Sequence, residues 1–96
     1  MILGYDTGTS AVKIIALDEN RVAATKSIIG SEKTAGELLN DFLNENGISA
    51  DSVSAIAVTG VGAEKSIIDG FEGKITIVSE IEATGEGGVW LSKLDE

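Results

Sequence analysis

The sequence predicts an α/β domain in which helices pack against a mixed sheet. Three extended segments open the chain, separated by short polar turns, and a strong helix signal follows them. Beyond that helix, apolar segments of strand type alternate with segments of helical type. Early strands joined by tight turns, followed by alternating strands and helices, are typical of a mixed sheet with the order β-β-β-α-β-α-β-α.

The first three strands are predicted within residues 1–29. Residues 1–5 are a short apolar run, residues 11–17 (AVKIIAL) are apolar with one lysine, and residues 21–29 (RVAATKSII) form a third extended segment. Residues 18–20 (DEN) have the composition of a turn. The second and third segments are therefore predicted to form a hairpin or meander.

The clearest helix signal begins at Thr34. Thr34 and Glu37 have the spacing of a capping box, in which each side chain accepts a hydrogen bond from the other residue's backbone amide. Four apolar residues then recur at helical spacing: Leu38, Leu39, Phe42 and Leu43. Asn46-Gly47 supplies the stop signal, so one amphipathic helix is predicted between these two ends.

Two strands and two helices are predicted in the second half. Residues 53–60 (VSAIAVTG) predict a buried strand that runs into a glycine turn, and residues 63–68 a short helix. Residues 74–80 (KITIVSE) are rich in β-branched residues and predict another strand. Residues 81–94 are predicted to be helical although three glycines disfavour it, because glycine is tolerated in a helix where another backbone approaches closely.

Composition excludes several classes of function. The chain has 96 residues, 7 Lys and Arg against 16 Asp and Glu, and neither Cys nor His. A net charge of −9 repels polyanions, so nucleic acid and anionic membranes are not expected partners. Disulfides, thiolate or histidine metal sites and Ser-His-Asp catalysis are excluded. With no secretion signal and no run long enough to span a bilayer, one cytoplasmic domain is expected.

A turn suited to phosphate lies at residues 5–10 (YDTGTS). Gly8 lets the backbone bend so that several N–H groups point into one concavity, which can hold phosphate oxygens. Hydroxyl donors flank this glycine: Thr7, Thr9 and Ser10. Lys13 adds a cation on the following strand. The same residues are ordinary turn formers, so a plain β-hairpin is the alternative interpretation.

Asp6 lies inside this turn, where a carboxylate would be repelled by bound phosphate. A divalent cation between the two would remove that repulsion. Mg²⁺ is the expected ion, held by Asp6 directly or through water, because Mg²⁺ prefers a few carboxylates together with phosphate oxygens.

Residues 59–66 (TGVGAEKS) resemble a P-loop only superficially. Thr59 and Glu64 stand where its two glycines are required, and Lys65 replaces the third glycine of the dinucleotide-binding pattern. What remains is a strand, a glycine and a helix at the carboxyl end of a strand, where open α/β sheets commonly bind ligands. A structural turn and a ligand-facing backbone both stay open.

Two carboxylates, Glu80 and Glu82, lie where a strand is predicted to end and a helix to begin. The helix macrodipole favours acidic residues at that place and explains both of them. The alternative makes Glu80 a general base, which requires that it face the same cleft as Asp6.

Three segments in this order resemble one family: DTGTSAVK at 6–13, TGVGA at 59–63 and SEIEATGEGGVWLSKLD at 79–95. They are similar to the N-terminal half of type II pantothenate kinases, within the actin-like ATPase superfamily of sugar kinases, Hsp70 and actin. The resemblance covers essentially all 96 residues. It implies a ribonuclease H-like half-domain of the actin-like ATPase fold, and an activity in which ATP phosphorylates the primary hydroxyl of pantothenate, the first step of coenzyme A synthesis.

The resemblance also implies a role for each candidate residue. Asp6 would lie beside Mg²⁺, and Glu80 would take the proton from the attacking hydroxyl. The β- and γ-phosphates of ATP would be wrapped by three residues of the turn: Gly8, Thr9 and Ser10. Lys13 would neutralise the charge of these phosphates. Thr9 departs from the glycine usual at its position, and its Cβ limits the approach of phosphate.

Actin-like ATPases close two lobes around the nucleotide, and residues 1–96 match a single lobe. The chain is therefore expected to be a fragment or one half of a split protein, inactive alone, with the missing C-terminal lobe as partner and a homodimer as a further option. One alternative is an ATPase activator of the 2-hydroxyacyl-CoA dehydratase type, although Ala83-Thr84 replace that family's usual Cys-His. The other alternative is a non-catalytic interaction domain that retains the fold.

Overall fold

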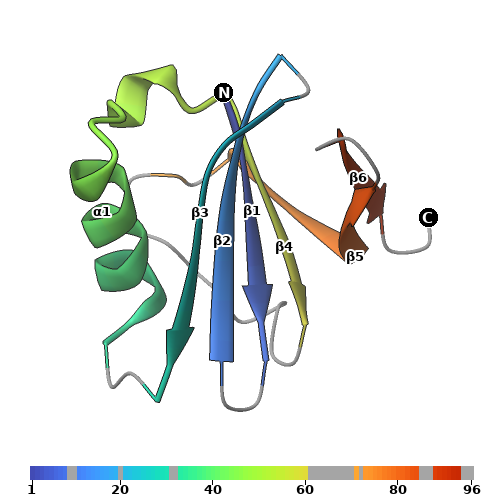
Figure 1. Cartoon of the computed structure of the whole chain (residues 1–96), viewed down its shortest axis with the longest axis horizontal. Helices are drawn as coiled ribbons and strands as arrows, with labels where there is room; N and C mark the ends of the chain where they lie inside the picture. The colour runs from blue at the N-terminus through green and yellow to red at the C-terminus, as the bar shows by residue number, and fades with distance from the viewer. Residues whose placement is uncertain are drawn as a thin grey trace.

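The computed structural model describes residues 1–8, 11–19, 21–30, 33–60, 71, 73–84 and 88–93. Of residues 80, 82–84 and 88–93 it describes the backbone alone. The elements in chain order (Figure 1) are β1 (Ile2–Thr7), β2 (Ala11–Asp18), β3 (Arg21–Ile29), α1 (Ala35–Glu45), the 3-10 helix η1 (Ala50–Ser52), β4 (Ala55–Gly60), β5 (Ile75–Thr84) and β6 (Gly88–Lys93).

The strands form one mixed sheet in the order β3-β2-β1-β4-β5-β6. The first three strands are an antiparallel meander, as predicted. β4 then pairs parallel with β1, and β5 parallel with β4, whereas β6 returns antiparallel to β5. Figure 1 shows α1 beside the meander and the β5–β6 pair at the other side of the sheet. The predicted α/β class with a mixed sheet is confirmed.

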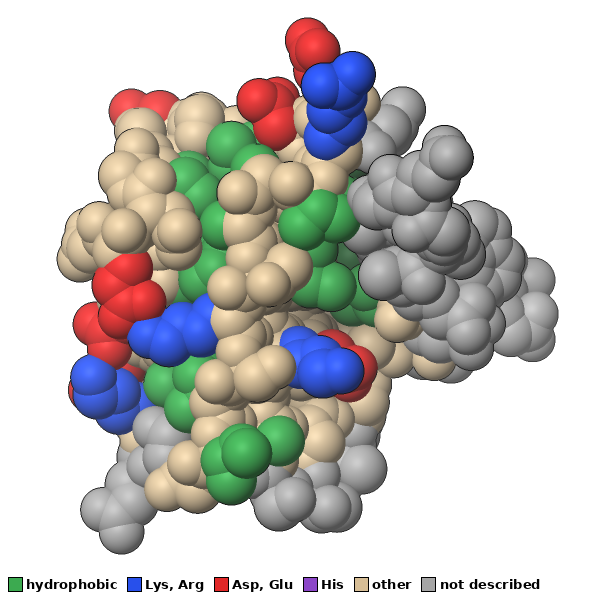
Figure 2. Space-filling model, in the orientation of Figure 1, with side chains coloured by type: hydrophobic (Ala, Val, Ile, Leu, Met, Phe, Trp, Pro, Cys, Tyr) green, Lys and Arg blue, Asp and Glu red, His purple; other side chains and the backbone are tan. Residues whose placement is uncertain are grey.

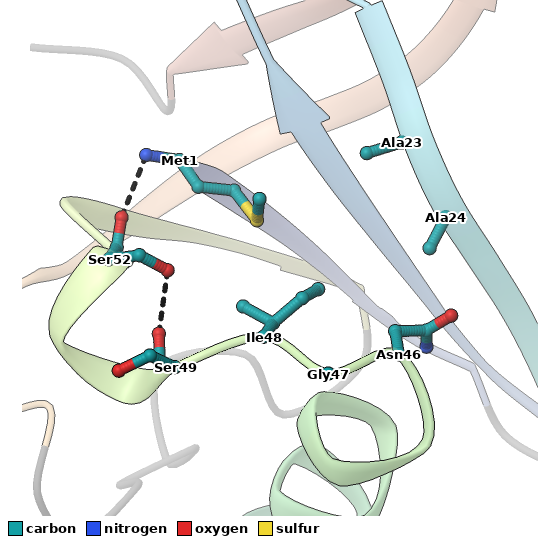
Figure 3. Close-up of a pocket in the computed structure, with 8 residues that line it drawn as sticks. All are labelled: Met1, Ala23, Ala24, Asn46, Gly47, Ile48, Ser49 and Ser52. Atoms are coloured by element: carbon teal, nitrogen blue, oxygen red, sulfur yellow. Dashed lines mark hydrogen bonds between the residues drawn. The ribbon is translucent and has the colours of Figure 1, made fainter.

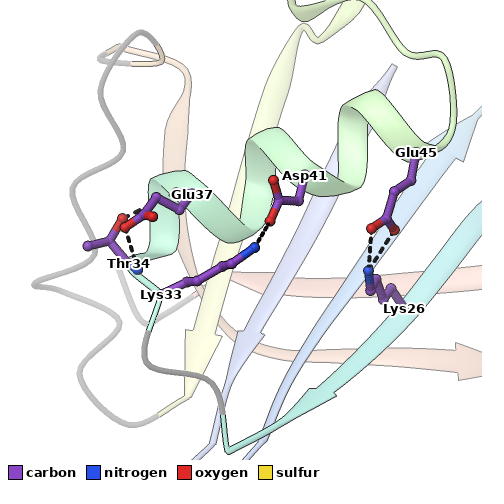
Figure 4. Close-up of polar contacts among 6 residues, drawn as sticks. All are labelled: Lys26, Lys33, Thr34, Glu37, Asp41 and Glu45. Carbon is purple, nitrogen blue, oxygen red and sulfur yellow. Dashed lines mark hydrogen bonds and ion pairs between the residues drawn. The ribbon is translucent and has the colours of Figure 1, made fainter.

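Helix α1 is defined at both ends by the residues that predicted it. The Glu37 amide donates to Thr34 Oγ1 and the Thr34 amide donates to the Glu37 carboxylate, each at 3.2 Å (Figure 4). At the other end Gly47 adopts a φ of +64°, which glycine reaches without strain. The following Ile48 amide donates to the Leu43 carbonyl at 2.9 Å. A carbonyl of the last helical turn is therefore satisfied by the segment that follows the helix.

The core lies between α1 and one face of the sheet. The four apolar residues that predicted the helix are all buried, and Phe42 has no exposed surface. They pack with alternate residues of the central strands and with two residues of the connecting segments: Leu3, Tyr5, Ile14, Ala16, Val53, Ile56, Val58 and Phe71. Burial raises the pKa of the Tyr5 phenol, because the charged form loses its hydration.

Two ion pairs link α1 to the segments beside it (Figure 4). The Lys26 ammonium on β3 contacts both carboxylate oxygens of Glu45, at 2.6 and 2.7 Å. Lys33 donates to Asp41, and this hydrogen bond raises the pKa of Lys33. Exposed pairs of this kind contribute little to stability, because solvent screens the attraction between their charges. On the face shown in Figure 2, lysine and arginine side chains lie beside acidic ones rather than gathering into one basic patch.

The helix predicted over residues 81–94 is wrong for the part of that segment that the structure describes. β5 continues to Thr84, and β6 pairs with it, for example Ile81 with Leu91 and Thr84 with Gly88. Each glycine costs a helix roughly 1 kcal/mol, and Val and Trp, the residue types at 89 and 90, are enriched in strands. Of the three glycines, the described one, Gly88, is the first residue of β6. The helix predicted over residues 63–68 lies outside the described residues.

Within the described residues, no helix combines the length and apolar character needed to cross a lipid bilayer.

Candidate functional site

The parallel strands β1, β4 and β5 bring three of the segments singled out in the sequence to one region of the sheet. Asp6 of β1 is the register partner of Thr59 in β4, and Thr7 is the partner of Gly60. The β4–β5 register runs only as far as Val58, after which β5 turns away toward β6 (Figure 1). The carboxyl ends of β1 and β4 therefore form the edge at which open α/β sheets bind ligands.

Asp6 and Lys13 are direct partners across the antiparallel β1–β2 pair, so they share one face of the sheet. Because side chains alternate along a strand and Tyr5 points into the core, this face is the one opposite α1. Both side chains are half-buried or exposed, and neither takes part in an ion pair with another described side chain. Within the described part of the chain, no ion pair therefore competes with a ligand for the Asp6 carboxylate. No cluster of three potential metal ligands occurs among the described residues.

Gly8 closes the β1–β2 hairpin rather than offering a free N–H group. Its amide donates to the Ala11 carbonyl at 2.7 Å. A Cβ on Gly8 would lie 2.9 Å from the same carbonyl oxygen, so the close turn requires glycine for space. The Gly8 amide is thus used within the hairpin, and the predicted role of Gly8 in wrapping phosphate stays a prediction. Thr9 and Ser10, at the tip of the hairpin, lie outside the described residues.

The corner at the end of β4 makes contacts that sequence reasoning missed. The Thr7 hydroxyl donates to the Thr59 carbonyl at 3.1 Å, and the buried Thr59 hydroxyl donates to the Ser79 carbonyl at 3.1 Å. Gly60 has a φ of +104°, and a Cβ on it would lie 1.8 Å from the Thr7 carbonyl oxygen. The predicted strand end at Gly60 is confirmed, and the structure adds a close backbone contact between β4 and β1 at this residue. One signal in the sequence could have indicated these contacts, namely the lone Thr59 near the end of an otherwise apolar, buried strand.

Glu80 lies inside β5 and not at the start of a helix. The helix-dipole explanation of Glu80 and Glu82 is therefore wrong for the described structure, since both residues belong to a paired strand. The β5–β6 register shifts between Val78 and Glu80. Only the backbone of Glu80 is described, so its predicted role as a base stays a prediction.

A separate pocket of about 460 Å³ lies at the opposite, amino end of β1 (Figure 3). Its polar groups bond to one another: the Met1 amino group donates to the Ser52 carbonyl at 2.8 Å, and the Ser52 hydroxyl donates to the Ser49 carbonyl at 2.6 Å. Small and apolar side chains provide much of the remaining wall: Ala23, Ala24 and Ile48. No lysine or arginine lines this pocket, and the cationic Met1 amino group that does is bonded to the Ser52 carbonyl.

Comparisons with known proteins support the fold without naming an activity. No family model matches the chain. It is 30% identical over 96 residues to the uncharacterized protein MJ0800 of Methanocaldococcus jannaschii, an alignment that covers 98% of this chain and 23% of that protein. The chain thus spans about a quarter of the length of the curated relative that it matches.

A solved structure gives the class of fold. The chain resembles an activator of the 2-hydroxyisocaproyl-CoA dehydratase from Clostridium difficile with bound ADPNP, at a TM-score of 0.60 and 22% identity. The match covers 79% of this chain and 28% of that one. The chain is an α/β half-domain of the actin-like ATPase fold. This structural likeness is to a dehydratase activator.

Proposed function

We propose that the chain is a nucleotide-binding lobe of an ATPase of the activator type, with its site at the carboxyl ends of β1 and β4. The observation that carries this proposal is the placement of Asp6. This carboxylate has no ion-pair partner among the described side chains, and it lies at the ligand-binding edge of a sheet whose fold matches an activator with bound ADPNP.

The residues of this lobe would act by positioning and charge. Mg²⁺, when bound, would neutralise phosphate oxygens, and Asp6 would hold it directly or through water. Lys13, the cross-strand partner of Asp6, would face the same phosphates. Thr9 and Ser10 would contribute hydroxyl donors from the hairpin tip, and Glu80 would orient or deprotonate the attacking oxygen. Phosphoryl transfer depends mainly on such positioning and neutralisation.

The activator reading is favoured over pantothenate kinase because the structural likeness is to an activator. Pantothenate kinase rests on the sequence resemblance alone and remains the second candidate. The two differ in the acceptor of the phosphoryl group, which is water for an ATPase and a primary hydroxyl for the kinase. Both give the same prediction for Asp6.

Replacing Asp6 with Asn is expected to lower the affinity for Mn²⁺ with ADPNP at least tenfold, because the amide loses the charge that holds the cation. Mn²⁺ replaces Mg²⁺ as a paramagnetic probe, and its binding broadens the amide NMR signals of nearby residues. We expect broadening at residues 5–7 and 58–60 in the wild-type chain. Asp18→Asn is the matched control, since Asp18 is exposed at the far end of the β1–β2 hairpin.

The outcomes of this titration separate the claims. Equal broadening in wild type and Asp6→Asn would show that Asp6 is not the metal residue. No broadening in the wild-type chain at millimolar probe would overturn nucleotide binding by this lobe and favour a non-catalytic interaction domain.

The isolated chain is expected to show no turnover above background, because actin-like ATPases close two lobes around the nucleotide. ATP hydrolysis and ATP-dependent phosphorylation of pantothenate are measured side by side on the purified chain. A turnover of about 1–100 s⁻¹, the range usual for kinases, would contradict this expectation. Activity with pantothenate but not with water would replace the activator reading with the kinase.

A further inference from the structure

On the side that faces β4 and β1, side-chain contacts hold the end of β5 beyond the point where its strand ladder with β4 stops. The register between β4 and β5 stops at Val58 and Ile77. Beyond this last pair, the Thr59 hydroxyl donates to the Ser79 carbonyl at 3.1 Å. Thr59 is 6% exposed whereas Ser79 is exposed, so this hydrogen bond is partly shielded from competing water. It fixes the residue immediately before Glu80.

A second contact fixes the residue immediately after Glu80. Two atoms of the Ile81 side chain, Cδ1 and Cγ2, lie 3.2 and 3.5 Å from the place where a Cβ on Gly4 would stand. Gly4 belongs to β1, so its lack of a side chain lets Ile81 pack directly on that strand. The backbone of Glu80 is thus held from both sides, by β4 through Ser79 and by β1 through Ile81.

Thr59 also connects this segment to Asp6. It is the register partner of Asp6 across the parallel β1–β4 pair. Its carbonyl accepts a hydrogen bond from the hydroxyl of Thr7, the residue next to Asp6, at 3.1 Å. One buried residue therefore receives a bond from the strand that carries Asp6 and gives a bond to the strand that carries Glu80.

We propose that Thr59 is a positioning residue whose hydroxyl sets the backbone of Glu80 at a fixed distance from Asp6. The inference rests on the proposed function and adds to it a residue that touches neither nucleotide nor metal. A displacement of about 1 Å in such a site can lower a reaction rate a hundredfold, which is why one buried hydroxyl matters there.

Thr59→Val and Thr59→Ser form the test pair, because Val keeps the branched shape without the hydroxyl and Ser keeps the hydroxyl. The first readout is amide hydrogen exchange at residues 79–81, which reports local opening. We expect exchange to accelerate at least tenfold in Thr59→Val and less than threefold in Thr59→Ser. Equal exchange in the two variants would overturn the proposal, whatever the nucleotide results.

The second readout distinguishes positioning from a merely structural role. With Mn²⁺ and ADPNP bound, Thr59→Val is expected to keep the broadening at residues 5–7 within twofold of wild type. Broadening at residues 79–81 should change at least threefold, because the distance from the metal to β5 is no longer fixed. Unchanged broadening at both segments would overturn the positioning role while leaving the proposed function intact. Absent broadening in the wild-type chain would instead overturn the proposed function, and the positioning role with it.

Discussion

Replacing Gly60 with Ala is expected to lower the free energy of unfolding by about 3 kcal/mol or more. The added Cβ would lie 1.8 Å from the Thr7 carbonyl oxygen, so β1 and β4 would have to separate. Forced contacts in a packed interior cost about 1–3 kcal/mol, and a side chain at a φ of +104° adds roughly 1–2 kcal/mol. Because a small domain has only about 5–15 kcal/mol of stability, much of it would be lost.

Gly73→Ala is the control for this change. Gly73 has a comparable φ of +87°, but a Cβ there would meet nothing within 4 Å. Its cost should be the backbone strain alone, about 1–2 kcal/mol. Urea unfolding followed by circular dichroism measures both variants. If Gly60→Ala were no more destabilising than Gly73→Ala, the close contact between β1 and β4 would be wrong.

Phe42→Ala is expected to cost about 3–5 kcal/mol, because it removes a large, fully buried side chain at the centre of the α1 face. The space left cannot collapse easily, since the sheet beneath it is held by hydrogen-bonded strands. Thermal and urea unfolding of the variant give the value.

Asn40→Ala, on the exposed side of the same helix, is the matched control and should change stability by less than about 0.5 kcal/mol. A loss below about 1 kcal/mol for Phe42→Ala would mean that α1 does not pack on the sheet as described.

Local signals predicted the first half of the fold well. The turn composition at residues 18–20 predicted the β2–β3 connection, and the reciprocal spacing of Thr34 and Glu37 predicted the start of α1. Both features are decided within a few residues, so sequence alone contains them. The β5–β6 pair could not be predicted in this way. The helical assignment of residues 81–94 gave too little weight to glycine and to pairing between segments, which a helical pattern does not report.

The candidate site was predictable only in part for a similar reason. Asp6 stood out because a carboxylate beside a phosphate-binding turn would need a cation, although the structure places Asp6 within β1 and not inside the turn. Thr59 could not be recognised from the sequence, because its hydrogen-bond partner Ser79 lies 20 residues away. Only the parallel arrangement of β4 and β5 brings the two residues together. Gly60 was recognised as a turn glycine, whereas its contact with Thr7 depends on a strand more than fifty residues earlier.

The central place of β1 has a consequence for how the molecule acquires its structure. β1 pairs with β2 through a short hairpin, but its other edge pairs with β4, where Ile2 meets Ala55. During synthesis the meander therefore exists for a time with the inner strand unpaired along one side, open to association with other chains. Contacts so distant in sequence slow folding, so closure of the sheet by β4 is expected to be the late, rate-limiting event.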